Sequence, residues 1–142
     1  MADFSRFRDA LKGLSVLVVD DEPDALELAG LLFDYAGARV TIAATARDAL
    51  RALTEEWADL LVTDLAMPGD DGFRLIREVR RLRAGRGGEI RIVAFSAMDA
   101  SDLRLRALAE GADVHVSKPC APDLLLRIVQ DLLRGPEHGR VA

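Results

Sequence analysis

The amino-acid sequence predicts an α/β fold in which helices cover both faces of a five-stranded parallel sheet. Two observations lead to this prediction. Five short apolar runs alternate with longer segments in which apolar residues recur at the spacing of an amphipathic helix. Three of these runs are nearly unbroken Val, Leu, Ile and Ala, as expected for parallel strands covered on both faces. We expect the strands at residues 15–20, 39–43, 59–64, 90–95 and 113–117.

The helices expected between the strands have recognisable ends. Two prolines, Pro23 and Pro122, stand where a first helical turn would begin. Thr45 followed by Asp48 resembles a capping box that opens the second helix. The fourth helix, at about 101–110, has the weakest apolar stripe. Glycines that would end helices are Gly37, Gly111 and Gly135.

The 142 residues are expected to form one domain, because this length suffices for a single sizeable core. We place this domain at residues 15–134, with an N-terminal extension or linker at 1–14 and a C-terminal tail at 135–142. Residues 80–89, with Gly85, Gly87 and Gly88, are typical of an exposed loop.

Composition narrows the possible classes of protein. Half of the residues are hydrophobic and the net charge is −5, so nothing indicates broad affinity for nucleic acid. The single cysteine, Cys120, excludes an internal disulfide. No apolar run approaches a membrane span, and charges near the N-terminus break any secretory pattern. We expect a cytoplasmic protein that binds neither membranes nor, directly, nucleic acid.

Polar residues stand at the carboxyl ends of four expected strands. Five strands joined by right-handed crossovers most simply give the flavodoxin-like order 2-1-3-4-5. Ligands of such sheets bind outside the carboxyl ends of the strands, near the switch in winding direction. The topology therefore brings these polar residues to one place. They are Asp20, Asp21, Asp64, Ser96 and Lys118.

The acidic residues at this edge suit a divalent cation and phosphoryl chemistry. Asp64 ends the central strand and is a candidate nucleophile for phosphoryl transfer. A carboxylate that attacks an anionic phosphoryl group needs its charge offset, which Mg²⁺ can do. Because Mg²⁺ keeps several waters, few protein ligands suffice. We expect Asp21, Asp64 and the backbone carbonyl of Ala66 as direct ligands, with Asp20 acting through water. Mn²⁺ could substitute.

Two further residues complete the expected site. The ammonium of Lys118 could pair with Asp64 at rest and with a phosphoryl oxygen afterwards. The hydroxyl of Ser96 can donate a hydrogen bond to a phosphoryl oxygen, and the small Ala97 beside it leaves that site open.

Four segments in this order resemble the receiver domain of two-component response regulators. They are VVDDE (18–22), DLAMPGDDG (64–72), SA (96–97) and KP (118–119), and the resemblance spans about 15–134. It implies that Asp64 accepts a phosphoryl group from a sensor histidine kinase or a histidine phosphotransfer protein. It also implies a cis peptide before Pro119 that directs Lys118 into the cleft. Phosphorylation would then change a surface formed by the fourth helix, fifth strand and fifth helix, which binds a downstream protein.

Two positions depart from the family pattern. His115 stands where the family often carries a Tyr or Phe that moves inward on activation. His115 is either a half-exposed strand histidine or a pH-sensitive residue of the switch, to which Ser96 also belongs. Cys120 stands where an aromatic is common, and we interpret it as a small core residue rather than a redox sensor. Seven arginines between 74 and 91 are interpreted mainly as a solvated helix face.

We therefore expect a single-domain response regulator that is monomeric or weakly dimeric. We do not expect a conventional enzyme, since the protein would catalyse only its own phosphorylation and dephosphorylation. Alternatives are a receiver domain of a hybrid sensor kinase and a scaffold receiver that works without phosphorylation. A phosphatase with an aspartate nucleophile is less favoured, because such an enzyme needs a second carboxylate two residues after the nucleophile, where this chain has Ala66. A nucleotide-binding flavodoxin relative is disfavoured by the acidic run at 20–22, which would repel phosphate.

Overall fold

The computed structural model describes residues 4–67, 70–86, 89–96 and 101–134. Its main sheet is parallel throughout and has the strand order β2-β1-β3-β6-β7. This confirms the predicted order 2-1-3-4-5, because the short strands β4 and β5 form a separate antiparallel pair. The strands are β1 (Ser15–Val19), β2 (Arg39–Ala43), β3 (Leu60–Asp64), β4 (Ala66–Met67), β5 (Asp70–Asp71), β6 (Arg91–Ser96) and β7 (Val114–Ser117).

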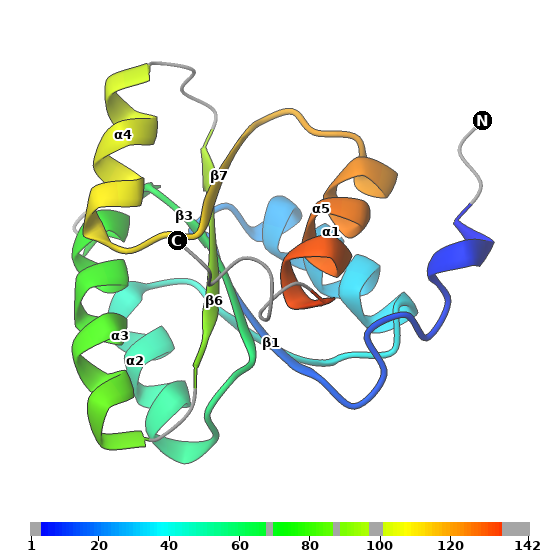
Figure 1. Cartoon of the computed structure of the whole chain (residues 1–142), viewed down its shortest axis with the longest axis horizontal. Coiled ribbons are helices and arrows are strands. Elements are labelled where there is room, and N and C mark those ends of the chain that lie inside the picture. The colour runs from blue at the N-terminus through cyan, green and yellow to red at the C-terminus, as the bar shows by residue number, and fades with distance from the viewer. Residues whose placement is uncertain (1–3, 68–69, 87–88, 97–100, 135–142) are drawn as a thin grey trace.

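The helices form one layer on each face of the sheet (Figure 1). Helices α2, α3 and α4 cover one face, and α1 and α5 cover the other. None of the helices in the described ranges is long and apolar enough to cross a membrane. The helices are α1 (Pro23–Tyr35), α2 (Ala46–Glu55), α3 (Gly72–Arg86), α4 (Ser101–Glu110) and α5 (Pro122–Arg134).

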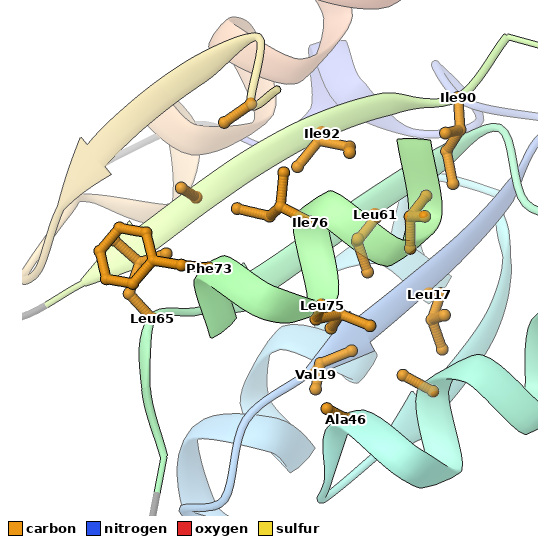
Figure 2. Packing of buried hydrophobic residues seen from close by; sticks show 14 of the residues in the cluster. Leu17, Val19, Ala46, Leu61, Leu65, Phe73, Leu75, Ile76, Ile90 and Ile92 are labelled. Carbon is orange, nitrogen blue, oxygen red and sulfur yellow. The ribbon is translucent and has the colours of Figure 1, made fainter. Parts of the chain in front are cut away.

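Each face of the sheet has its own hydrophobic core. Successive residues of β1 alternate between them: Leu17 packs in the core under α2, α3 and α4, and Val18 packs in the core under α1 and α5. Figure 2 shows Leu75 and Ile76 of α3 lying over the strands in the first of these cores. All five residues of β1 are buried, as the unbroken apolar run predicts.

The helix boundaries follow the predicted signals. Helices α1 and α5 begin at the two prolines. Thr45 Oγ1 accepts a hydrogen bond from the Asp48 amide at 3.0 Å, which caps α2. Gly37 and Gly111 follow α1 and α4 with φ of 91° and 125°, conformations that favour glycine. Gly135 lies outside the described residues.

The prediction of an exposed loop at 80–89 is wrong, because α3 continues to Arg86. Arg80 explains why this part of the chain stays helical. Its guanidinium donates to the carbonyls of Ile90 at 2.6 Å and Gly111 at 2.9 Å, and it pairs with Asp113 at 3.0 Å. These tertiary contacts override the local preference of Gly85 for a turn. Gly87 and Gly88 lie outside the described residues.

The interpretation of the arginines as a solvated face is also wrong for several of them. Arg77 makes a two-pronged ion pair with Glu110 of α4, with N–O distances of 3.0 and 2.9 Å. Arg91 is only 7% exposed. Arg77 and Arg80 thus join α3 to α4 and to the residues just before β6 and β7.

Residues 4–14, which we call the N-terminal segment, pack on the end of α1. The segment contains a short 3₁₀ helix, η1 (Ser5–Phe7), and buries Phe7 and Leu11 almost completely in the second core. The Leu11 amide donates to the carbonyl of Ala36 at 2.7 Å. Gly37 lies so close that an added Cβ would be 3.0 Å from Asp9 Cα. The segment is therefore held by both apolar and backbone contacts.

Candidate functional site

Three carboxylates gather at the carboxyl edge of the sheet. Asp20 and Asp21 directly follow β1, and Asp64 is the last residue of the adjacent strand β3. One carboxylate oxygen from each of these residues lies within 4.8 Å of the others. The sequence predicted this convergence, because parallel neighbouring strands end at the same edge. A set of only oxygen ligands in this arrangement fits Mg²⁺.

The three carboxylates differ in how they are held. Asp20 is 6% exposed, and both of its oxygens accept hydrogen bonds, one from the Glu22 amide at 3.0 Å and one from Lys118 Nζ at 2.8 Å. Asp21 is exposed. Asp64 is partly buried, and its Oδ1 accepts a long hydrogen bond of 3.4 Å from the Ala66 amide. Asp21 and Asp64 are thus the carboxylates better placed to bind a cation directly.

Lys118 pairs with a different carboxylate from the one expected. Its ammonium donates to Asp20 rather than to Asp64, and it lies 5.3 Å from the centre of the Phe95 ring. The peptide bond between Lys118 and Pro119 is cis, as the resemblance implied. Sequence reasoning did not single out Phe95, although its place just before Ser96 at the end of a strand was a signal. The pairing keeps the lysine charge at the acidic cluster.

The pKa of Asp64 lies above its ordinary value. Burial is the main cause, because it penalises the charged carboxylate; the Lys118 ammonium lowers the pKa, and the Asp20 carboxylate raises it further. A cation bound between these carboxylates would offset both the burial and the repulsion. The electrostatics of the cluster therefore favour metal binding.

This raised pKa predicts that Asp64→Asn raises the Tm of the metal-free chain at neutral pH. The folded chain holds the Asp64 proton more tightly than the unfolded chain does. Its stability therefore decreases as pH rises from the ordinary carboxyl value of 3.8 through the raised folded value. Asparagine does not ionise, so the variant does not lose this stability as pH rises. Its gain in Tm over wild type should therefore be small below pH 3.8 and largest at neutral pH.

Thermal unfolding in EDTA at several pH values tests this expectation, with Asp131→Asn on exposed α5 surface as the control. A gain of the same size at every pH would contradict the assignment of the effect to the Asp64 charge.

Ser96 and Ala66 also lie at this edge. Ser96 ends β6 and is fully buried, and its carbonyl accepts a hydrogen bond from the Lys118 amide at 2.6 Å. Ala66 is exposed in β4, two residues after Asp64; metal binding by its carbonyl stays a prediction. Ala97 lies outside the described residues.

The two residues that depart from the family pattern lie on β7 and just after it. His115 is partly buried on β7, in register with Ala94 of β6, and its role as a switch stays a prediction. Cys120 is partly buried against the second core, and burial, followed by the nearby Asp123 charge, raises the pKa of its thiol. A raised thiol pKa fits the interpretation of Cys120 as a packing residue rather than a reactive one.

Comparison with known proteins identifies this arrangement. The family model of the response regulator receiver domain matches residues 16–130. The chain belongs to this family. The match begins within β1 and ends within α5, so it includes residues from every strand of the main sheet and all of the candidate site residues.

Proteins of different length contain similar sequences. The chain is 40% identical over 120 residues to an uncharacterised 14.6 kDa protein of Leptolyngbya boryana, covering 84% of this chain and 90% of that protein. It is 32% identical to the response regulator SaeR of Staphylococcus aureus, again over 84% of this chain, but spans only 50% of SaeR. The solved CheY-like receiver domain protein of Methanospirillum hungatei superposes with a TM-score of 0.79 and 28% identity, covering 89% of this chain and 97% of that one.

Proposed function

We propose that this receiver domain accepts a phosphoryl group on Asp64 from a sensor histidine kinase or a histidine phosphotransfer protein, in a reaction that depends on Mg²⁺. The observation that carries the proposal is the meeting of Asp20, Asp21 and Asp64 within 4.8 Å, beside Lys118. Family membership supports the same function.

In the proposed reaction, a carboxylate oxygen of Asp64 attacks phosphorus. The new O–P bond forms as the P–N bond to the donor imidazole breaks, and the electron pair of that bond returns to the imidazole nitrogen. Bound Mg²⁺ would neutralise phosphoryl charge and fix the orientation of the oxygens. Asp21 and Asp64 would hold it directly, while Asp20 positions Lys118. Attack by water later releases inorganic phosphate and restores the Asp64 carboxylate.

Ser96 and Lys118 would then bind oxygens of the phosphoryl group. The Ser96 hydroxyl can donate a charge-assisted hydrogen bond to a phosphoryl oxygen, which contributes about 1.5–3 kcal/mol. That is enough to shift two conformations of similar energy. The output would be a change at the surface of α4, β7 and α5, which binds a downstream protein.

The wider setting is part of the proposal. We propose a single-domain regulator of the cytoplasm, monomeric or weakly dimeric. The similarity to the Leptolyngbya boryana protein over 90% of its length supports a one-domain form. The match to half of SaeR leaves open the alternative that such a domain belongs to a larger protein.

Labelling with acetyl phosphate tests this function. In Mg²⁺, intact-mass analysis should show the gain of one phosphoryl group, and EDTA should prevent it. Continuous turnover of phosphomonoesters would instead favour an aspartate-nucleophile phosphatase. No adduct from any donor would favour a scaffold receiver.

A further inference from the structure

The Lys118 side chain reaches across the carboxyl edge of the sheet. Lys118 directly follows β7, whereas its carboxylate partner Asp20 directly follows β1, and the strands β3 and β6 lie between these two. At the far end of this path, Lys118 Nζ donates to Asp20 Oδ2 at 2.8 Å. At the near end, the Lys118 amide donates to the carbonyl of Ser96, the last residue of β6, at 2.6 Å. The flexible part of the lysine side chain therefore passes the end of β6.

Phe95 lies beside this path. It precedes Ser96 on β6 and is in register with Asp64 of β3. Phe95 is partly buried at the border of the second core, and the Lys118 ammonium lies 5.3 Å from the centre of its ring. A cation within about 6 Å of an aromatic ring is attracted by the negative charge on the face of that ring. The ammonium is thus held from two sides, by a carboxylate and by a ring.

The need for a hydrophobic residue in β6 does not by itself explain an aromatic ring under the ammonium. The Lys118 side chain is 23% exposed, so water competes with the acidic cluster for its charge. An aliphatic neighbour would exclude water from the ammonium and return nothing for the lost hydration. The face of an aromatic ring replaces part of that hydration. Phe95 therefore favours the ammonium at the cluster over the ammonium in water.

The same ring would serve both partners of the ammonium. One oxygen each from Asp20, Asp21 and Asp64 lie within 4.8 Å of one another. In the proposed reaction, Lys118 moves from Asp20 to an oxygen of the phosphoryl group on Asp64. An ammonium that is already kept at the cluster has only this short distance to move.

We propose that Phe95 is a positioning residue for phosphoryl transfer, whose ring keeps the Lys118 ammonium at the acidic cluster. The inference rests on the proposed function, because the part that Lys118 plays in the reaction belongs to that function. The holding of the ammonium is a property of the resting chain, so it can be measured without metal and without a phosphoryl donor.

The chain contains two lysines, Lys12 and Lys118, which makes a direct measurement possible. Exchange of ammonium protons with water is followed by NMR in EDTA, on chain made with ¹⁵N-labelled lysine. Phe95→Leu should speed the exchange at Lys118 about two- to fivefold, the factor that a cation–π contact of this kind contributes. Phe95→Tyr, which keeps the ring, should exchange like wild type. Lys12 is exposed and should be unchanged in every variant.

Labelling with acetyl phosphate and Mg²⁺ tests the link to the reaction. Phe95→Leu should slow labelling by about the same two- to fivefold factor, and Phe95→Tyr should label like wild type. In a Lys118→Met background, Phe95→Leu should change nothing, because the ring then has no ammonium to hold. Phe4→Leu is the matched control, since Phe4 is also partly buried at the border of the second core. It should leave both measurements at the wild-type values.

The two measurements separate this inference from the proposed function. Wild-type exchange at Lys118 in Phe95→Leu, or equal acceleration in Phe95→Tyr, would overturn the positioning role. An equal effect of Phe4→Leu, or equal slowing of labelling by Phe95→Leu with and without Lys118, would overturn it as well. Failure of wild-type labelling would overturn the proposed function and the link to the reaction, while the exchange rates would still decide whether Phe95 holds the ammonium.

Discussion

Replacement of Asp64 by asparagine should reduce labelling by acetyl phosphate below detection. The amide of asparagine carries no anionic oxygen to attack phosphorus, whereas its size and shape match those of aspartate. The fold should remain intact, because the same change is expected to raise the Tm of the metal-free chain. Loss of labelling would therefore report chemistry and not unfolding.

The measurement is intact-mass analysis of wild type and variants after equal incubation with acetyl phosphate and Mg²⁺. Asp131→Asn, on the exposed surface of α5, is the control and should label like wild type. Lys118→Met should still fold but label more slowly, since it removes the cation held at the acidic cluster. Undiminished labelling of Asp64→Asn would place the acceptor elsewhere and refute the assignment.

Replacement of Phe7 by alanine should destabilise the chain by about 3–5 kcal/mol, the usual cost of truncating a buried phenylalanine. Phe7 is 1% exposed and packs in the core under α1 and α5, although it precedes the first strand. The loss includes the transfer of the ring to water and the cavity left behind. Such a loss is a large fraction of the stability of a typical domain.

Urea unfolding gives the free energy of unfolding in water for both proteins. Phe4→Ala is a control within the same segment, because Phe4 is only partly buried and should cost less. A Phe7→Ala variant within about 1 kcal/mol of wild type would mean that the N-terminal segment is not part of the stable core.

The central sheet and its acidic edge could be predicted from the sequence for a simple physical reason. Strands buried on both faces need unbroken apolar runs, and Val16 to Val19 and Leu60 to Val62 are such runs. The polar residues that follow each apolar run then lie at the carboxyl edge of the sheet, whatever the details of packing. The place of Asp20 and Asp64 therefore follows from chain order and strand direction alone.

Features that depend on tertiary contacts could not be predicted in this way. The length of α3 depends on Arg80 reaching the carbonyls of Ile90 and Gly111, while the local sequence with Gly85 indicated a loop. The choice of Asp20 over Asp64 as the partner of Lys118 depends on distances of a few ångströms at the ends of different strands. The two-residue strands β4 and β5 are too short to leave a periodic pattern.

The burial of the N-terminal segment was only partly visible in the sequence. The sequence indicated only an extension or linker at residues 1–14, although Phe7 and Leu11 have the spacing of one helical turn. Their burial depends on a surface made by α1 and the strands, which the local sequence does not specify.

A Mg²⁺ titration of the ¹⁵N-labelled chain, followed by amide chemical shifts, tests most directly whether the carboxylates of Asp20, Asp21 and Asp64 form a cation site. The wild type should show saturable shifts at these residues that fit one site. Asp21→Asn and Asp64→Asn should each weaken binding at least about tenfold by removing a direct ligand, while Asp131→Asn should not change it. Shifts that fail to saturate, or equal affinity in all four proteins, would contradict the account.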